Sequence, residues 1–212
     1  MPTLQILFDL TSLFIGFIFG SFVNVIVHRL PQNISIIKPR SFCPECNKII
    51  PWYENIPIFS WIFLKGKCSE CNLSIPLRYP LIETFTGIFF WIIYKCTLYN
   101  VGIENYLLNL LASWGFILIL FSLSIIDYYY LWIPNSLIKI GFIFGFFISI
   151  FLSITNNQNL IPNIFESLIS GILGFLIITL IMKFGELIFK KPSMGFGDAK
   201  LAGMIGFWIG FP

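Results

Sequence analysis

Charged side chains are scarce in this sequence. Asp, Glu, Lys and Arg together make up 11% of the 212 residues, and histidine occurs once. Hydrophobic residues make up 57%, phenylalanine alone contributes 25 residues, and the mean hydropathy is +0.87. A soluble domain of this length cannot bury so many large apolar side chains in one core. The composition therefore excludes an ordinary soluble protein and predicts a membrane-embedded chain.

Nucleotide-binding signatures are also missing. The sequence has no glycine-rich phosphate-binding loop and no dinucleotide fingerprint. We expect no nucleic-acid partner, and we expect one membrane domain with a single inserted polar loop.

Six apolar stretches run along the chain. The first five each come near the roughly 20 residues that a helix needs to cross a bilayer, and the sixth is shorter. We therefore predict an all-α polytopic membrane protein with about six transmembrane helices. The last helix is expected either to cross incompletely or to lack material that normally follows it. The stretches are residues 7–27, 81–99, 106–126, 137–154, 164–184 and 199–211.

The first apolar stretch is predicted to be a retained anchor. The opening residues, MPTLQILFDL, carry no positive charge, and no small-residue cleavage site follows a short apolar core, as a cleaved signal peptide would require. We expect three regions: a first transmembrane helix at 1–27, a polar loop domain at 28–80, and a membrane-embedded domain at 81–212.

The basic residues predict the orientation, because cytoplasmic loops of membrane proteins are enriched in Lys and Arg. If the breaks after the first, third and fifth stretches are cytoplasmic, 12 of the 13 basic residues lie inside, and only Lys95 lies on the other side. The N-terminus is then outside and the polar loop is in the cytoplasm. The 12 residues are Arg29, Lys38, Arg40, Lys48, Lys65, Lys67, Arg78, Lys139, Lys183, Lys190, Lys191 and Lys200.

Two aspartates lie at the ends of apolar stretches on the predicted cytoplasmic side. Asp127 ends the third stretch in SIIDYYYLWIPN, and Asp198 begins the sixth in GFGDAK. Taken singly, Asp127 is equally a hydrated interfacial residue or a helix cap, and Asp198 is equally a carboxylate favoured by a helix macrodipole. Ionisable residues at the edge of the hydrocarbon are costly and are functional candidates. Their shared side of the membrane favours a paired site.

A pair of carboxylates can hydrolyse a peptide bond. Two carboxyl groups at one site do not both ionise easily, so the ionised one can accept a proton from water while the protonated one polarises the peptide carbonyl. Gly195 and Gly197 would let the backbone bend and approach a substrate strand closely. Lys200 either binds a lipid headgroup, tunes a carboxylate, or is an ordinary snorkelling lysine. The pattern indicates aspartic-type hydrolysis.

Four cysteines form two C-x2-C pairs in the polar loop. Cys43 and Cys46 lie in CPEC, Cys68 and Cys71 lie in CSEC, and 21 residues separate the pairs. This spacing is typical of zinc ribbons, in which four thiolates hold a tetrahedral ion. Two disulfides are the alternative, although the predicted cytoplasmic location is a reducing one, where structural disulfides are rare. We expect a structural zinc that staples a loop too small for a large core.

Four segments together resemble one protein family. In this order and combination they are similar to the type IV prepilin peptidases, the bifunctional leader peptidase/N-methyltransferases of bacterial pilus, type II secretion and competence systems. Many members of that family carry aspartate at the position of Asn135. The segments are GSFVNVIVHRLP at 20–31, RSFCPECNKIIPWYENIPIFSWIFLKGKCSECNLSIPLRYPLIETFTG at 40–87, SIIDYYYLWIPN at 124–135 and GFGDAKLAGMIGFWIG at 195–210.

The resemblance implies a function, a site and a location. Asp127 and Asp198 would be the catalytic aspartates, and the four cysteines would bind zinc in the cytoplasmic domain. The substrate would be a type IV prepilin or pseudopilin in the bacterial inner membrane, whose short basic leader is removed after a glycine at the cytoplasmic face. The exposed amino group would then be methylated with S-adenosylmethionine as the donor.

Two other functions agree with the sequence. One is a non-catalytic or truncated membrane protein whose zinc loop is a docking module in a pilus or secretion assembly. The other is a small transporter with a zinc-stabilised loop. Leader cleavage that depends on both aspartates would favour the peptidase over these alternatives.

Overall fold

Every regular element in the described part of the chain is a helix. The computed structural model describes residues 2–100, 106–155, 160–191 and 194–210. Within these ranges the β-type pairs are two isolated bridges, Phe42 with Ile49 and Lys67 with Ser74. The chain forms two compact units, an N-terminal unit of residues 1–100 and a C-terminal unit of residues 101–212. The predicted all-α membrane fold is confirmed.

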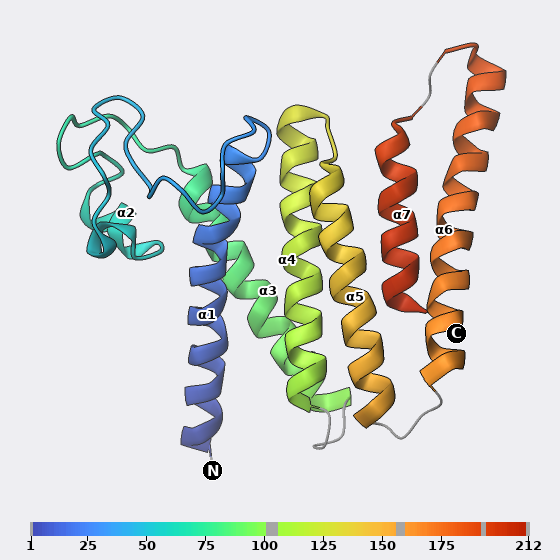
Figure 1. Cartoon of the computed structure of the whole chain (residues 1–212). Coiled ribbons are helices and arrows are strands. Elements are labelled where there is room, and N and C mark those ends of the chain that lie inside the picture. The colour runs from blue at the N-terminus through green and yellow to red at the C-terminus, as the bar shows by residue number, and fades with distance from the viewer. Residues whose placement is uncertain (1, 101–105, 156–159, 192–193, 211–212) are drawn as a thin grey trace. The chain divides into compact units, whose positions relative to one another are not determined.

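The N-terminal unit is built on two long antiparallel helices, α1 (Pro2–Arg29) and α3 (Arg78–Asn100). The polar loop between them contains two short helical turns, η1 (Trp52–Asn55) and α2 (Phe59–Phe63), which the sequence analysis did not predict (Figure 1). The apolar stretch at 81–99, which lies in α3, thus packs against α1. The proposed boundary between the polar loop domain and the membrane-embedded domain at residue 81 stays a prediction.

Glycines allow α1 and α3 to touch along their backbones. A Cβ atom at Gly16 would lie 2.6 Å from the Cα of Gly87, and one at Gly20 would lie 2.6 Å from the Cα of Glu83. No side chain fits into these gaps. Small residues at a helix crossing permit the close packing that holds helices together in lipid.

The C-terminal unit contains four helices, α4 (Tyr106–Tyr130), α5 (Asn135–Thr155), α6 (Leu160–Phe189) and α7 (Phe196–Ile209). Successive helices run in opposite directions, so that the C-terminal end of α4 and the N-terminal ends of α5 and α7 lie at the same end of this unit (Figure 1). This order brings together segments that are far apart in the sequence.

The helix α7 packs on its neighbours through small residues. A Cβ at Gly206 would lie 2.5 Å from the carbonyl oxygen of Ser170 in α6. On the other side, the indole nitrogen of Trp208 donates a hydrogen bond of 2.9 Å to the carbonyl of Gly141 in α5. Both contacts fix the position of α7 within the unit.

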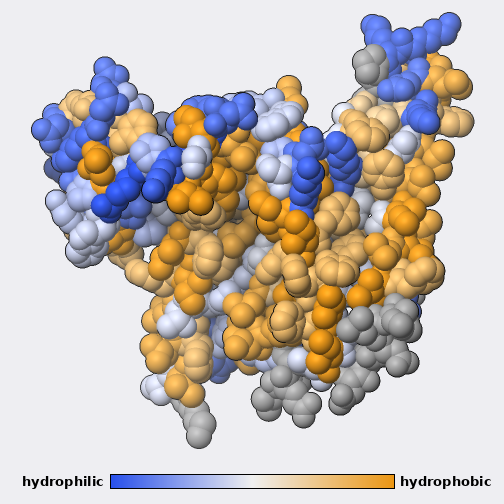
Figure 2. Space-filling view, in the orientation of Figure 1, coloured by the Kyte–Doolittle hydropathy of each residue, from blue (hydrophilic) through white to orange (hydrophobic). Residues whose placement is uncertain are grey.

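Five helices, α1, α3, α4, α5 and α6, are long and apolar enough to cross a membrane. Figure 2 shows apolar residues along the helices and polar residues gathered at helix ends and over the polar loop. Large apolar side chains on these helices are exposed, for example Phe184 of α6 at 68%, as expected for a surface that contacts lipid. The chain is a multi-pass membrane protein.

The predicted apolar stretches all lie in helices, except that Gly210 follows the end of α7 and residue 211 lies outside the described residues. The helices extend beyond the stretches because polar and aromatic residues continue the helical turns at their ends. Thus α3 begins at Arg78, and α4 continues past Asp127 to Tyr130. The sixth stretch is short as predicted, since α7 has 14 residues.

The basic residue predicted on the outer side, Lys95, is paired. Its ammonium group lies 2.6 Å and 2.7 Å from the two carboxylate oxygens of Asp9, and each side chain is 24% exposed. The pair joins α1 to α3 near the end of the N-terminal unit that is opposite the polar loop. Pairing explains how a lysine is accommodated within an apolar helix.

We predict that Lys95→Met lowers the stability of the protein by about 1–3 kcal/mol, because the Asp9 carboxylate loses its charged partner. Thermal unfolding in detergent micelles measures the change. The double variant Asp9→Asn/Lys95→Met should recover most of the loss, since it leaves no unpaired charge. A single variant that melts at the wild-type temperature would show that the pair does not stabilise the fold.

Candidate functional site

The two C-x2-C pairs fold into two similar turns. In the first, the backbone amide of Cys43 donates to the carbonyl of Lys48 at 2.9 Å. The second turn repeats this bond between Cys68 and Leu73 at 2.8 Å. A left-handed backbone at this point favours asparagine, which tolerates it better than most residues. The residues that adopt it directly after the second cysteine of each pair are Asn47 (φ 56°) and Asn72 (φ 59°).

The four thiols converge on one point. All four sulfur atoms lie within 4.8 Å of one another, with Cys43 and Cys71 separated by 3.7 Å and Cys46 and Cys68 by 3.9 Å. A tetrahedral zinc ion with bonds of about 2.3 Å separates its sulfur ligands by about 3.8 Å. The tetrad therefore fits zinc. None of the four cysteines forms a disulfide, so the disulfide alternative is not supported.

The pKa values of two thiols in the tetrad are shifted in opposite directions. Hydrogen bonds from the backbone amides of Cys71 and Glu70 lower the pKa of Cys68 to about 7. For Cys71, a hydrogen bond from the backbone of Leu73 lowers the pKa, but burial and hydrogen bonds with the neighbouring thiols outweigh it and raise the pKa to about 12. A metal ion that binds here must therefore displace protons from the tetrad.

A polar cluster links the two turns to η1. The ammonium group of Lys48 donates to Ser69 at 2.9 Å and lies 3.3 Å from the carboxylate of Glu70 and 3.7 Å from that of Glu54. Ser69 in turn donates to Glu54 at 2.8 Å. The hydrogen bond with Glu70 is the largest cause that raises the pKa of Lys48. Sequence reasoning missed this cluster, because its members have no diagnostic spacing.

The two predicted catalytic aspartates lie at helix ends in the C-terminal unit. Asp127 is in the last turn of α4, where its carbonyl accepts a hydrogen bond of 2.8 Å from the amide of Leu131. Asp198 is the third residue of α7, and its amide donates to the carbonyl of Gly195 at 3.1 Å. Both side chains are half-buried. Each carboxylate is therefore at the boundary between packed helices and polar surroundings.

The segments that carry the aspartates are in contact. A Cβ at Gly197 would lie 3.0 Å from the Cβ of Ile133, in the turn that follows α4. The side-chain oxygen of Asn135, the first residue of α5, accepts a hydrogen bond of 2.8 Å from Lys200. The start of α7 is thus fastened to the α4–α5 turn on both sides of Asp198.

The two glycines of the predicted motif have different roles. Gly197 lies against Ile133, so a larger residue there would force the turn and the helix apart. Gly195 is the N-cap residue that directly precedes α7, and a Cβ at this position would lie 3.4 Å from a carboxylate oxygen of Asp198. Lys200 pairs with an amide and lies 5.1 Å from the centre of the Phe196 ring, which the sequence analysis did not anticipate.

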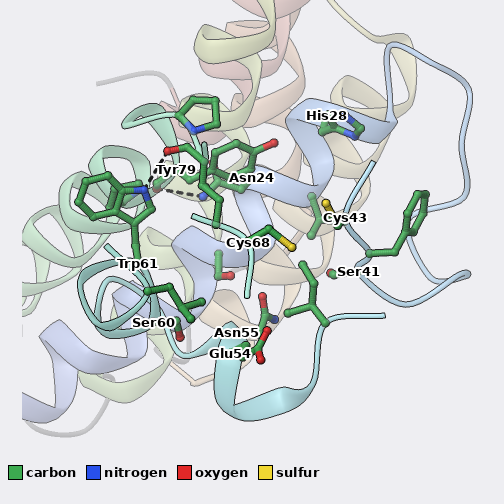
Figure 3. A pocket seen from close by; sticks show the side chains of 18 of the residues that line it. Asn24, His28, Ser41, Cys43, Glu54, Asn55, Ser60, Trp61, Cys68 and Tyr79 are labelled. Carbon is green, nitrogen blue, oxygen red and sulfur yellow. Dashed lines mark hydrogen bonds between the residues drawn. The ribbon is translucent and has the colours of Figure 1, made fainter. Parts of the chain in front are cut away.

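A cavity of about 300 Å³ lies within the N-terminal unit, between the polar loop and the adjoining ends of α1 and α3 (Figure 3). Its walls include Cys43 and Cys68 of the tetrad, aromatic side chains, and the carboxylate of Glu83. Glu83 is 8% exposed. Sequence reasoning missed it, although a carboxylate within an otherwise apolar helix is a signal that could have singled it out.

Comparisons with known proteins assign the two halves of the chain to related models. Residues 14–97 match the "Bacterial Peptidase A24 N-terminal domain", and residues 114–212 match the "Type IV leader peptidase family". The first match falls in the N-terminal unit, which holds the cysteine tetrad, and the second contains both aspartates. No solved structure matches the chain.

Curated relatives carry the name "Prepilin leader peptidase/N-methyltransferase". The chain is 35% identical to the protein from Vibrio cholerae over 97% of its own length and 77% of that relative. It is 31% identical to the protein from Stutzerimonas stutzeri, over 96% of the chain and 74% of the relative. For Myxococcus xanthus the identity is also 31% over 96% of the chain, which spans 56% of that relative.

We predict that the protein binds one zinc ion and that Cys43→Ser abolishes this binding, because three thiolates leave the tetrahedral shell open. Metal analysis of the purified protein measures the stoichiometry. Cys96→Ser is the matched control, since Cys96 lies in α3 outside the tetrad and its replacement should leave the zinc content unchanged. Equal zinc content in wild type and Cys43→Ser would contradict the tetrad assignment.

Proposed function

Because this chain belongs to the type IV leader peptidase family, we propose that it removes the basic leader of a type IV prepilin or pseudopilin and N-methylates the new amino terminus. The proposed place of this reaction is the cytoplasmic face of a bacterial inner membrane. The observation that carries the peptidase assignment is the contact between the first turn of α7, which contains Asp198, and the turn that directly follows Asp127 at the end of α4.

In the proposed hydrolysis, the two aspartates share one proton. The ionised carboxylate accepts a proton from a water molecule, whose oxygen bonds to the carbon of the scissile peptide. The protonated carboxyl group donates its proton to the carbonyl oxygen. When the carbon–nitrogen bond breaks, the amine leaves with the proton that the first carboxylate accepted, and the carbonyl proton returns to its partner. One water is consumed.

The half-buried positions of Asp127 and Asp198 support these roles. Partial burial removes bulk water from around the two carboxyl groups, which strengthens their electrostatic interactions with a bound peptide. Gly195 and Gly197 keep side chains away from the backbone next to Asp198, where a substrate strand would bind. Lys200 is proposed to position this turn through its hydrogen bond with Asn135.

The orientation of the chain is part of the proposal. The N-terminus is placed outside and the polar loop inside, in agreement with the distribution of basic residues. Lys95, the one basic residue placed on the outer side, is paired with Asp9. A leader that stays in the cytoplasm would then meet both aspartates on its own side of the membrane.

Two groups that the chain does not supply complete the proposed activity. Zinc, held by Cys43, Cys46, Cys68 and Cys71, would stabilise the polar loop and leaves no coordination position for a reaction. S-adenosylmethionine would supply the methyl group for the second reaction. Membrane lipid surrounds the apolar helices in this proposal.

We predict that Asp127→Asn and Asp198→Asn each reduce leader cleavage by roughly 10²–10⁴-fold, because an amide neither accepts the proton of water nor donates an acidic one. Gel analysis of a membrane-bound prepilin incubated with each purified variant measures the loss. Glu186→Gln is the matched control, since it removes an exposed carboxylate near the end of α6 and should leave cleavage intact. Cleavage at the wild-type rate by either aspartate variant would refute the assignment.

We also predict that Gly197→Val reduces cleavage by about 10-fold or more, since the added side chain forces α7 away from Ile133 and displaces Asp198. The variant Gly197→Val/Ile133→Ala should recover part of this activity because the smaller residue makes room. Initial rates of leader removal measure both effects. If the second substitution gave no recovery, the contact would not be what positions the aspartate.

A further inference from the structure

The cavity in the N-terminal unit has the size and lining of a ligand site. Its volume of about 300 Å³ lies at the lower end of the range for sites that bind small molecules, about 300–1,000 Å³. Figure 3 shows Asn24, Trp61 and Tyr79 gathered on one side of it and Glu54, Asn55 and Ser60 on another. Aromatic and apolar walls with a few polar groups are what such sites require.

Glu83 is the buried acidic residue of this cavity. It accepts a hydrogen bond of 2.7 Å from the backbone amide of Ile58 and further hydrogen bonds from the side chains of Ser21 and Asn24. These three donors are all uncharged. Ionising a buried carboxyl group that has only neutral donors is costly, and a cationic ligand in the cavity would lower that cost.

Two of the three basic side chains in the cavity wall are engaged elsewhere. The guanidinium group of Arg29 donates to the carbonyls of Ser35 and Ile36 at 3.0 Å and 3.3 Å. The ammonium group of Lys48 contacts Glu70 and Glu54 in the polar cluster described above. His28, the remaining basic residue of the wall, lies beside Arg29 at the end of α1.

The backbone is strained at Ile58, the loop residue whose amide donates to Glu83. Ile58 has a φ of 63°, a value that branched side chains rarely adopt. Its amide is directed at Glu83, and the short helix α2 begins at the next residue. Within α2, the indole nitrogen of Trp61 donates to the carbonyl of Ile75 at 3.0 Å. The strained turn thus holds both the carboxylate and an aromatic wall in fixed positions.

We propose that this cavity binds S-adenosylmethionine and that Glu83 is the carboxylate that selects its positive charge. The inference rests on the proposed methylation and assigns a site to it. The donor combines a sulfonium cation with an aromatic adenine ring, and the cavity combines a buried carboxylate with the rings of Trp61 and Tyr79.

The test measures binding of tritiated S-adenosylmethionine to the full, zinc-loaded chain in detergent by equilibrium dialysis. Val25→Trp fills the cavity from α1 and should reduce affinity at least 10-fold. Phe22→Trp adds similar bulk to the same helix at a residue that is 48% exposed and does not line the cavity, so it should bind as wild type does. Zinc content reports that each variant is folded.

A second comparison isolates the role of charge. Glu83→Gln should weaken binding of S-adenosylmethionine at least 10-fold and weaken binding of S-adenosylhomocysteine, which lacks the sulfonium charge, much less. A purely structural role of Glu83 would weaken both ligands equally, and that result would overturn the charge assignment. Wild-type affinity in Val25→Trp would overturn the assignment of the cavity while leaving methylation in place.

Leader cleavage, measured on the same preparations, separates this inference from the function on which it rests. A wild-type protein that cleaves the leader and does not bind S-adenosylmethionine would refute both methylation and the cavity assignment but not the peptidase. Asp198→Asn should lose cleavage and keep donor binding.

Discussion

Close contact between helix backbones is the constraint on which both units depend. Lipid is as apolar as the side chains it surrounds, so helices in a membrane associate through packing and hydrogen bonds rather than through burial from water. In the N-terminal unit, Gly16 and Gly20 let α1 meet α3 without intervening side chains. In the C-terminal unit, Gly206 places α7 against the backbone of α6.

The packing of α7 on its neighbours also determines the geometry of the candidate active site. Because α7 is held along its length by α5 and α6, its first turn has a fixed position relative to the α4–α5 turn. Ile133 then contacts Gly197, and Asn135 bonds with Lys200. A larger residue at Gly197 or Gly206 would displace α7 from its neighbours and would therefore move Asp198. The geometry of the site is thus a consequence of helix packing far from it.

The sequence predicted those features that are encoded in a local pattern, such as the length of an apolar stretch or the spacing of cysteines. Long apolar stretches predicted the membrane helices, and two C-x2-C pairs predicted the convergence of four thiols. Contacts between distant residues were not predictable in this way. The pair formed by Asp9 and Lys95 joins residues on two different helices, and the hydrogen bond between Glu83 and Ile58 depends on a strained turn. Such contacts are set by tertiary packing, which no local pattern encodes.

The two proposed reactions place opposite demands on carboxylates. Hydrolysis uses a pair of carboxyl groups that share one proton, whereas recognition of a sulfonium cation uses a carboxylate that stays ionised. One cluster cannot satisfy both demands at a single pH, because bringing a third carboxylate to the pair would raise its affinity for protons. Asp127 and Asp198 belong to one unit, and Glu83 belongs to the other.

The order of the reactions follows from the same chemistry. Cleavage creates the amine that the methyl group is transferred to, and an α-amino group, with a pKa of about 7.7–8.0, is mostly protonated at neutral pH. A protonated amine has no lone pair and cannot accept a methyl group. The amine must therefore leave the acidic pair of aspartates and lose a proton before transfer. Separate sites on the two units meet this requirement, since the group that delivers protons in the first step is then absent from the second.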